Sequence, residues 1–164
     1  MSSQQLDLFN SIRENKVITK PIRLIEFFAG IGSQHKSLSV LQQAFPDKIK
    51  FESWKIVEWA IPSIKAYNYI HIKDFEDYSL GKTKEEMLER INGVSSNYNE
   101  PLSQKSLERM PLDKVKDIYN NCVATHNLVN IMNVKGVDLE VKETDKYEYI
   151  LTYSFPCQWY RTYH

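Results

Sequence analysis

Residues 21–33 read PIRLIEFFAGIGS, and this stretch decides the fold class of the chain. The apolar run from Ile22 to Phe28 is typical of a strand that is covered on both faces, as in a parallel sheet. Gly30 and Gly32 follow, and a glycine pair lets the backbone bend sharply and lets a ligand approach atoms that a Cβ would shield. The stretch therefore predicts a buried parallel strand that ends in a tight turn.

The residues after this turn continue an alternation of helix and strand. Residues 33–45 carry apolar side chains at intervals of three and four, which predicts a helix. Residues 50–60 are rich in β-prone side chains and predict a second strand. Residues 61–71 predict a short helix with Pro62 in its first turn. This order is typical of the opening of a doubly wound α/β fold.

The middle of the chain, residues 73–135, breaks this alternation. Thr83 stands three residues before Glu86, an arrangement that predicts a capping box at the start of a helix. Residues 111–128 predict a further helix, with Val115, Ile118, Tyr119 and Cys122 on one face. We interpret residues 73–135 as a helical insertion between the second and third strands, within a single domain of residues 1–164.

Three further segments complete the secondary-structure prediction. Residues 136–141, GVDLEV, predict a short third strand, and residues 147–155, YEYILTYSF, predict a longer one. Residues 1–20 are polar with a weak helical pattern and predict an amphipathic helix ahead of the first strand.

Composition is that of an ordinary globular protein. The chain has 164 residues, 42% hydrophobic and 26% charged, with a formal net charge of zero. No apolar run approaches the roughly 20 residues that span a bilayer, and the N-terminus lacks the apolar core of a secretory signal, so we expect a cytoplasmic protein with no membrane partner. The two cysteines and four histidines are scattered, so we expect no metal site. Because the chain has no basic excess, DNA binding would need a local patch or a partner region.

Three positions at predicted strand ends could carry chemistry. Glu58 ends the second strand, where a carboxylate can accept hydrogen bonds from both hydroxyls of a ribose, and Trp59 offers a flat face for a base. Asp138 would end the third strand. Pro156 and Cys157 follow the last strand, where a thiol would face the crevice in which α/β proteins bind their ligands. Taken singly, each has a structural alternative: a solvated charge, a core aromatic, a turn aspartate or a small buried thiol.

The order of these segments resembles the cytosine-5 DNA methyltransferases. LIEFFAGIGS is similar to their first cofactor motif, VEWAIPS to the acidic second motif and GVDL to the third. YILTYSFPCQ is similar to the strand and catalytic loop that begin with Pro-Cys-Gln. The resemblance covers most of residues 22–158, apart from the helical insertion. It implies a partial Rossmann-like fold that binds S-adenosylmethionine.

The resemblance also assigns roles to residues. Cys157 would be the catalytic nucleophile, adding as a thiolate to carbon 6 of cytosine so that carbon 5 can take a methyl group. Double-stranded DNA would be the substrate, with the target base flipped out of the helix. The cofactor would be held by Phe28, Ala29, Gly30, Ile31, Gly32, Glu58, Trp59, Asp138, Leu139 and Pro156.

The chain departs from the family pattern after Pro-Cys-Gln. Residues 159–164, WYRTYH, do not resemble the polar loop expected next, and a second catalytic acid, an Arg-x-Arg element and a target-recognition domain would be absent. We therefore expect the amino-terminal part of such an enzyme, truncated and inactive alone, from a bacterial, prophage or phage restriction-modification setting. Two alternatives stay open: one chain of a split methyltransferase completed by a second chain, or a non-catalytic regulatory or binding protein with a decayed methyltransferase fold.

Overall fold

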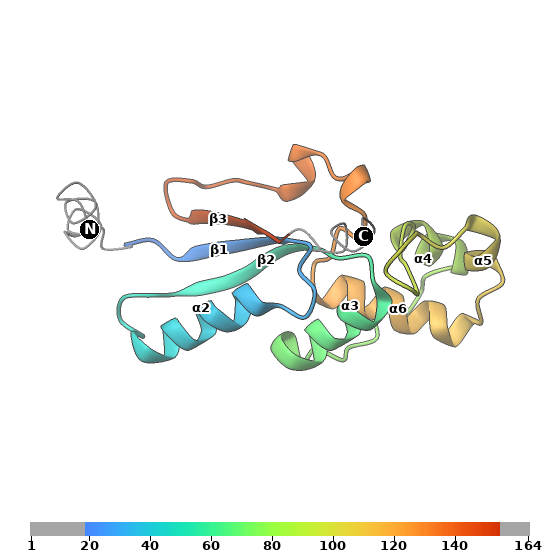
Figure 1. The fold of residues 1–164 in the computed structure, drawn as a ribbon, viewed down its shortest axis with the longest axis horizontal. Helices are drawn as coiled ribbons and strands as arrows, with labels where there is room; N and C mark the ends of the chain where they lie inside the picture. The colour runs from blue at the N-terminus through green and yellow to red at the C-terminus, as the bar shows by residue number, and fades with distance from the viewer. Residues whose placement is uncertain (1–18, 155–164) are drawn as a thin grey trace, which may run out of the picture.

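The computed structural model describes residues 19–154 and shows a mixed α/β arrangement built on a small parallel sheet (Figure 1). The sheet has three strands, β1 (Ile22–Phe27), β2 (Phe51–Val57) and β3 (Glu148–Tyr153), in the order β2-β1-β3. Both pairings are parallel. The architecture is thus compatible with a partial Rossmann-like fold. The predicted helix over residues 1–20 falls almost entirely outside the described residues.

The central strand, β1, is the most buried part of the sheet. Ile22, Leu24 and Ile25 are all fully buried, as expected for a strand with a neighbour on each side. Arg23 on β1 links the central strand to both of its neighbours. Its guanidinium donates hydrogen bonds to Glu52 Oε1 on β2 at 2.6 Å and to the Tyr149 hydroxyl on β3 at 2.9 Å. These contacts hold the amino-terminal halves of the strands in register.

Helix α2 (Ser33–Ala44) follows β1 through the glycine turn and runs along one face of the sheet (Figure 1). Its amino-terminal end has no local side-chain cap. Instead the backbone N–H of His35 donates to Glu26 Oε1 on β1 at 3.2 Å, which satisfies one of the free donors of the first turn. A buried carboxylate on the strand therefore anchors the start of the helix.

The remaining helices gather beyond the carboxyl ends of the strands (Figure 1). The predicted capping box is present, with Glu86 N donating to Thr83 Oγ1 and Thr83 N donating to Glu86 Oε2. The predicted apolar face of the longest of these helices is buried against its neighbours. The elements are α3 (Ile61–Tyr67), a π-helical turn (Asn68–Ile72), α4 (Lys84–Arg90), α5 (Gln104–Glu108) and α6 (Leu112–Ala124).

The predicted strand over residues 136–141 is wrong. Gly136–Leu139 form a short 3-10 helix, and Val137 on it is exposed. The end of β2 pairs instead with the segment that follows α6, through a parallel bridge between Ile56 and Asn127. Because that segment already occupies the free edge of β2 near its carboxyl end, residues 136–141 have no strand to pair with there.

Candidate functional site

The glycine turn between β1 and α2 is the tightest feature at the strand ends. Phe28, Gly30 and Gly32 all have positive φ, at 55°, 55° and 83°. The turn is held by two backbone bonds, Gly32 N to the Ala29 carbonyl at 2.8 Å and Ala29 N to the Val57 carbonyl at 3.2 Å. The second bond fixes the turn against the end of β2.

The two glycines of the turn serve different needs. A Cβ on Gly32 would lie 2.5 Å from His71 Nε2 and 2.7 Å from the Tyr67 ring, so close packing excludes any larger residue. A Cβ on Gly30 would meet nothing within 4 Å. The backbone at Gly30 is therefore open to a ligand, whereas Gly32 is closed by the protein itself.

Glu58 joins the turn to the end of β2. Its Oε2 accepts from Gly30 N at 2.8 Å, and its Oε1 accepts from Ala60 N at 2.7 Å. The residue is only 9% exposed. Each carboxylate oxygen can accept a second hydrogen bond, so the group keeps capacity for the hydroxyls of a ligand.

Asn127, which the sequence did not indicate, positions the backbone of Glu58. Its fully buried amide accepts from Glu58 N at 3.1 Å, donates to the Glu58 carbonyl at 2.9 Å and accepts from Val129 N at 2.9 Å. The side chain thus ties the segment after α6 to the carboxyl end of β2.

A cavity of about 410 Å³ opens at these strand ends. Four residues predicted to bind the cofactor, Phe28, Gly30, Glu58 and Trp59, line it together. The wall is mainly apolar and aromatic with a few polar groups, which is the usual make-up of a small-molecule site. Its other lining residues are Val57, Ser63, Tyr98, Val129, Asn130, Ile131, Met132 and Ser154.

The segment 129–132 forms a wall that the sequence reasoning missed. It follows α6 and continues from the bridge to β2, ending in a short 3-10 helix, Ile131–Asn133, whose start is capped by Asn130 Oδ1. The signal available in the sequence was the short apolar pair Leu128-Val129, but the predicted helix over residues 111–128 extended to Leu128, whereas α6 ends at Ala124. The apolar pair is too short to predict a strand from periodicity alone.

Five other predicted cofactor residues do not line this cavity. Ala29 is buried beneath the turn, Ile31 is exposed, and Gly32 packs on His71. Asp138 accepts from Lys135 N within its own 3-10 helix, and the Leu139 carbonyl accepts from Trp54 Nε1. Asp138 and Leu139 therefore lie away from this cavity, and residues 130–132 line it instead. Pro156 and Cys157 lie outside the described residues.

A buried polar network supports the turn from below. The Tyr67 hydroxyl donates to Glu26 Oε2 at 2.5 Å, and its oxygen lies 2.9 Å from His35 Nδ1 and 3.0 Å from Ser53 Oγ. Burial raises the pKa of Glu26, and the hydrogen bonds from Tyr67 and from the His35 backbone only partly oppose this. Burial, followed by the nearby His71, lowers the pKa of His35 to about 4. The imidazole is therefore neutral at pH 7.

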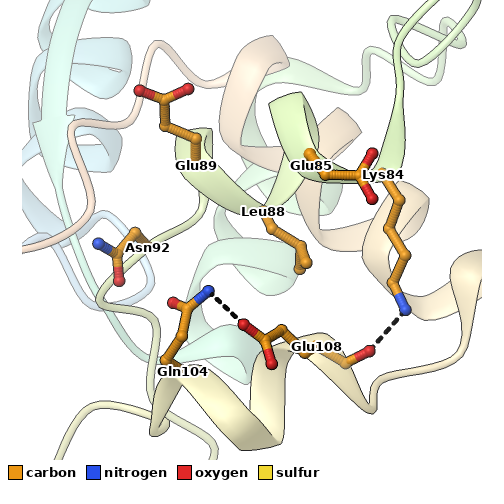
Figure 2. A pocket seen from close by; sticks show the side chains of 7 residues that line it. All are labelled: Lys84, Glu85, Leu88, Glu89, Asn92, Gln104 and Glu108. Carbon is orange, nitrogen blue, oxygen red and sulfur yellow. Dashed lines mark hydrogen bonds between the residues drawn. The ribbon is translucent and has the colours of Figure 1, made fainter.

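A second cavity, of about 500 Å³, lies between α4 and α5 (Figure 2). Its walls are long polar side chains around Leu88, and Lys84 Nζ reaches across to the Glu108 carbonyl at 2.7 Å. Gln104 also donates to the Glu108 carboxylate at 3.0 Å. None of the described residues that line this cavity is aromatic, so the strand-end cavity is the better site for a nucleoside.

Residues 19–154 hold neither a metal-binding cluster nor a membrane-spanning helix. No group of three or more histidine, cysteine, aspartate or glutamate side chains is placed there to hold a metal ion. None of the helices in this range combines the length and apolar character needed to cross a bilayer.

Comparison with known proteins identifies a methyltransferase relative. No protein-family profile matches the chain. The orphan methyltransferase M.SssI of Spiroplasma monobiae is 34% identical over 149 residues, which is 88% of this chain and 36% of the relative. The chain therefore spans about a third of the length of the relative that it matches.

Proposed function

Because the chain belongs to the cytosine-5 methyltransferase family, we propose that it forms the cofactor-binding part of a DNA cytosine-5 methyltransferase and holds S-adenosylmethionine in the strand-end cavity. One observation carries this proposal. Phe28, Gly30, Glu58 and Trp59 come from two separate strand ends and line one cavity. Ligands of open α/β sheets bind in this place, beyond the carboxyl ends of the strands.

The residues of the cavity fit the chemistry of the cofactor. Glu58 has free acceptor capacity for ribose hydroxyls, because its two oxygens each accept only one backbone hydrogen bond in this structure. Trp59 supplies an aromatic face for adenine. The open space above Gly30 admits a ligand close to the backbone.

The chemical step is proposed from the family. S-adenosylmethionine would supply the methyl group. The Cys157 thiolate would add to carbon 6 of a flipped cytosine in double-stranded DNA, and carbon 5 would take the methyl group. A base such as water would then take the proton from carbon 5, the electron pair of that bond would re-form the double bond between carbons 5 and 6, and the bond from carbon 6 to the Cys157 sulfur would break to release the thiolate. Modification of host or phage DNA alongside a restriction enzyme is the biological setting that we propose.

Calorimetry tests the cofactor site. Titration of the wild-type chain with S-adenosylhomocysteine should give saturable heat, and Glu58→Ala should weaken binding by about 100-fold, since it removes hydrogen bonds to a charged acceptor. Glu148→Ala, an exposed position at the start of β3 and at the far end of the sheet, is the matched control and should change binding by less than about twofold. Absence of heat in the wild type overturns the cofactor site, and equal binding by Glu58→Ala overturns the role of Glu58.

Covalent trapping tests the nucleophile. The chain is mixed with the regions of the Spiroplasma relative that it does not match, S-adenosylmethionine and duplex DNA containing 5-fluorocytosine. A covalent adduct should form in the wild type and be absent in Cys157→Ser. If calorimetry shows bound cofactor but the wild type forms no adduct, Cys157 is not the nucleophile of this mixture.

A further inference from the structure

We propose that Tyr98, carried by the segment between α4 and α5, is a further cofactor-binding residue that sets the preference for the adenine nucleoside. This inference rests on the proposed function, because it concerns the same cavity. Nothing in the sequence motifs pointed to this residue. Its ring lines the strand-end cavity, although it is 40 residues or more away in sequence from the turn and from the end of β2 that form the opposite walls.

Backbone hydrogen bonds attach the start of the segment that carries Tyr98 to the residues just after β2. Ser95 N donates to the Trp59 carbonyl at 2.7 Å, and Ile61 N donates to the Ser95 carbonyl at 2.9 Å. Ser95 is fully buried. The segment therefore leaves the end of β2 as a short parallel bridge, with its position defined relative to Trp59.

The segment is also closed on itself. Leu102 N donates to the Val94 carbonyl at 2.8 Å, so residues 95–101 form a loop with joined ends. Inside the loop Asn97 Oδ1 accepts from Asn99 N at 3.1 Å. Tyr98 sits at the tip with a φ of 68°, and it is 47% exposed, so one part of its ring is against the cavity and the other part faces solvent.

The position of Tyr98 indicates which end of the cavity it covers. The Ser63 hydroxyl is 3.5 Å from the Tyr98 hydroxyl, and Ser63 also lines the cavity. Ser63 belongs to the first turn of α3, four residues after Trp59. Tyr98 therefore lies beside the start of α3, on the same wall of the cavity as Ser63.

Two aromatic side chains that line one cavity suit a flat heteroaromatic base. Aromatic contacts add favourable energy beyond simple burial, and a half-exposed ring has a large area still to bury. Tyr98 should therefore contribute to the nucleoside half of the ligand. Substitution of Tyr98 should not change how the part of the ligand near the glycine turn contributes to binding.

Calorimetric titration with two ligands tests this assignment. S-adenosylhomocysteine and methylthioadenosine share the nucleoside, but only the first has the amino-acid half. Tyr98→Ala should weaken both by about 5- to 10-fold, whereas Tyr98→Phe, which keeps the ring, should stay within about twofold of wild type. Tyr69→Ala removes a more exposed tyrosine that does not line the cavity and should leave both affinities unchanged.

The outcomes separate this inference from the function on which it rests. If the wild type binds both ligands and Tyr98→Ala binds them equally well, Tyr98 is not a cofactor-binding residue, and the proposed function stands. If the wild type binds neither ligand, the proposed function and this inference both fall. If Tyr98→Ala weakens only S-adenosylhomocysteine, the assignment to the nucleoside end is overturned. Unfolding curves recorded for each variant show whether it is folded. Tyr98→Phe, which removes only the hydroxyl, shows whether the ring or the hydroxyl carries the effect.

Discussion

The helical region, α4 to α6 with its connecting loops, and the glycine-turn region, β1, β2, α2 and α3, differ in what is buried inside them. The helical region is packed by apolar side chains such as Ile91, Leu107 and Val115, all fully buried. Beneath the glycine turn a smaller apolar cluster that includes Ala29 and Ile56 lies beside buried polar groups, chiefly the Glu26 carboxyl and the Tyr67 hydroxyl. Helix α2 adds little apolar burial there, since His35 is its only buried residue.

This difference fits the two tasks of the molecule. Apolar burial is non-directional and mainly supplies stability. A buried hydrogen-bond network fixes the orientation of each member, because an unmet partner inside the protein is costly. Directional bonds therefore orient the groups beneath the turn in addition to apolar packing, whereas the helical region is held mainly by apolar packing.

The largest expected effect lies in the helical region. Ile91→Ala removes a fully buried side chain from the apolar core and should lower the free energy of unfolding by about 4 kcal/mol. Urea denaturation at pH 7 measures this loss. The control is Leu80→Ala, an exposed position that should change stability by less than about 0.5 kcal/mol. A loss below about 1 kcal/mol for Ile91→Ala would mean that the helical region is not stabilised by its apolar core.

The next effect separates the two glycines of the turn. Gly32→Ala should lower the free energy of unfolding by about 3 kcal/mol, because the new Cβ strains a left-handed backbone and meets His71 and Tyr67. Gly30→Ala is the matched control and should cost about 1 kcal/mol, since its backbone is also left-handed but the space around it is open. The same denaturation series measures both. Equal losses would show that backbone strain alone, without packing, explains why the turn needs glycine at both positions.

The regular elements were predictable from the sequence where their local pattern was strong. The run Ile22–Phe27, the helix Leu112–Ala124 and the capping box at Thr83 follow from periodicity and cap chemistry. The structure of residues 136–141 was not predictable, because their apolar alternation suits a strand only where a sheet edge is free to pair with it. Asn127 takes that edge through contacts that no local pattern encodes.

The residues of the candidate site also divide into those that the sequence indicated and those that it did not. Glu58 and Trp59 were indicated by their place at a strand end and by the resemblance. Tyr98 and Asn130 reach the cavity only because the chain between α4 and β3 folds back onto the end of β2. Long-range packing of this kind leaves no short-range signal in one sequence.

A third effect compares two buried tyrosines, one from each region. Tyr67→Phe should lower the free energy of unfolding by about 2 kcal/mol, because the Glu26 carboxyl loses its closest hydrogen-bond donor inside the protein. Tyr119→Phe in the helical region should cost less than about 0.5 kcal/mol, since the Tyr119 hydroxyl makes no hydrogen bond with any residue of the described range. Equal losses for the two variants, in parallel thermal or urea unfolding, would contradict the difference between the two interiors.

The smallest effect is a pH dependence, and His35 beneath the glycine turn is one of its sources. Burial lowers the pKa of His35 to about 4, whereas the unfolded chain protonates histidine with a pKa of about 6.5. Below pH 6.5 the unfolded state therefore binds a proton that the folded state does not, and stability falls as the pH falls toward 4. Between pH 7 and pH 5.5 this loss should reach about 1 kcal/mol.

Glu26 has the opposite sign and must be separated from His35. Because burial raises its pKa, the folded state takes up a proton before the unfolded state does, and this stabilises the protein as the pH falls. His35→Asn keeps Glu26, so the difference between the unfolding free energies of wild type and His35→Asn reports the histidine. That difference should change by about 1 kcal/mol between pH 7 and pH 5.5, because wild type loses this stability at the lower pH and His35→Asn does not. A difference that stays constant over this range would mean that His35 is protonated as easily in the folded protein as in the unfolded chain, and that the network beneath the turn does not hold it neutral.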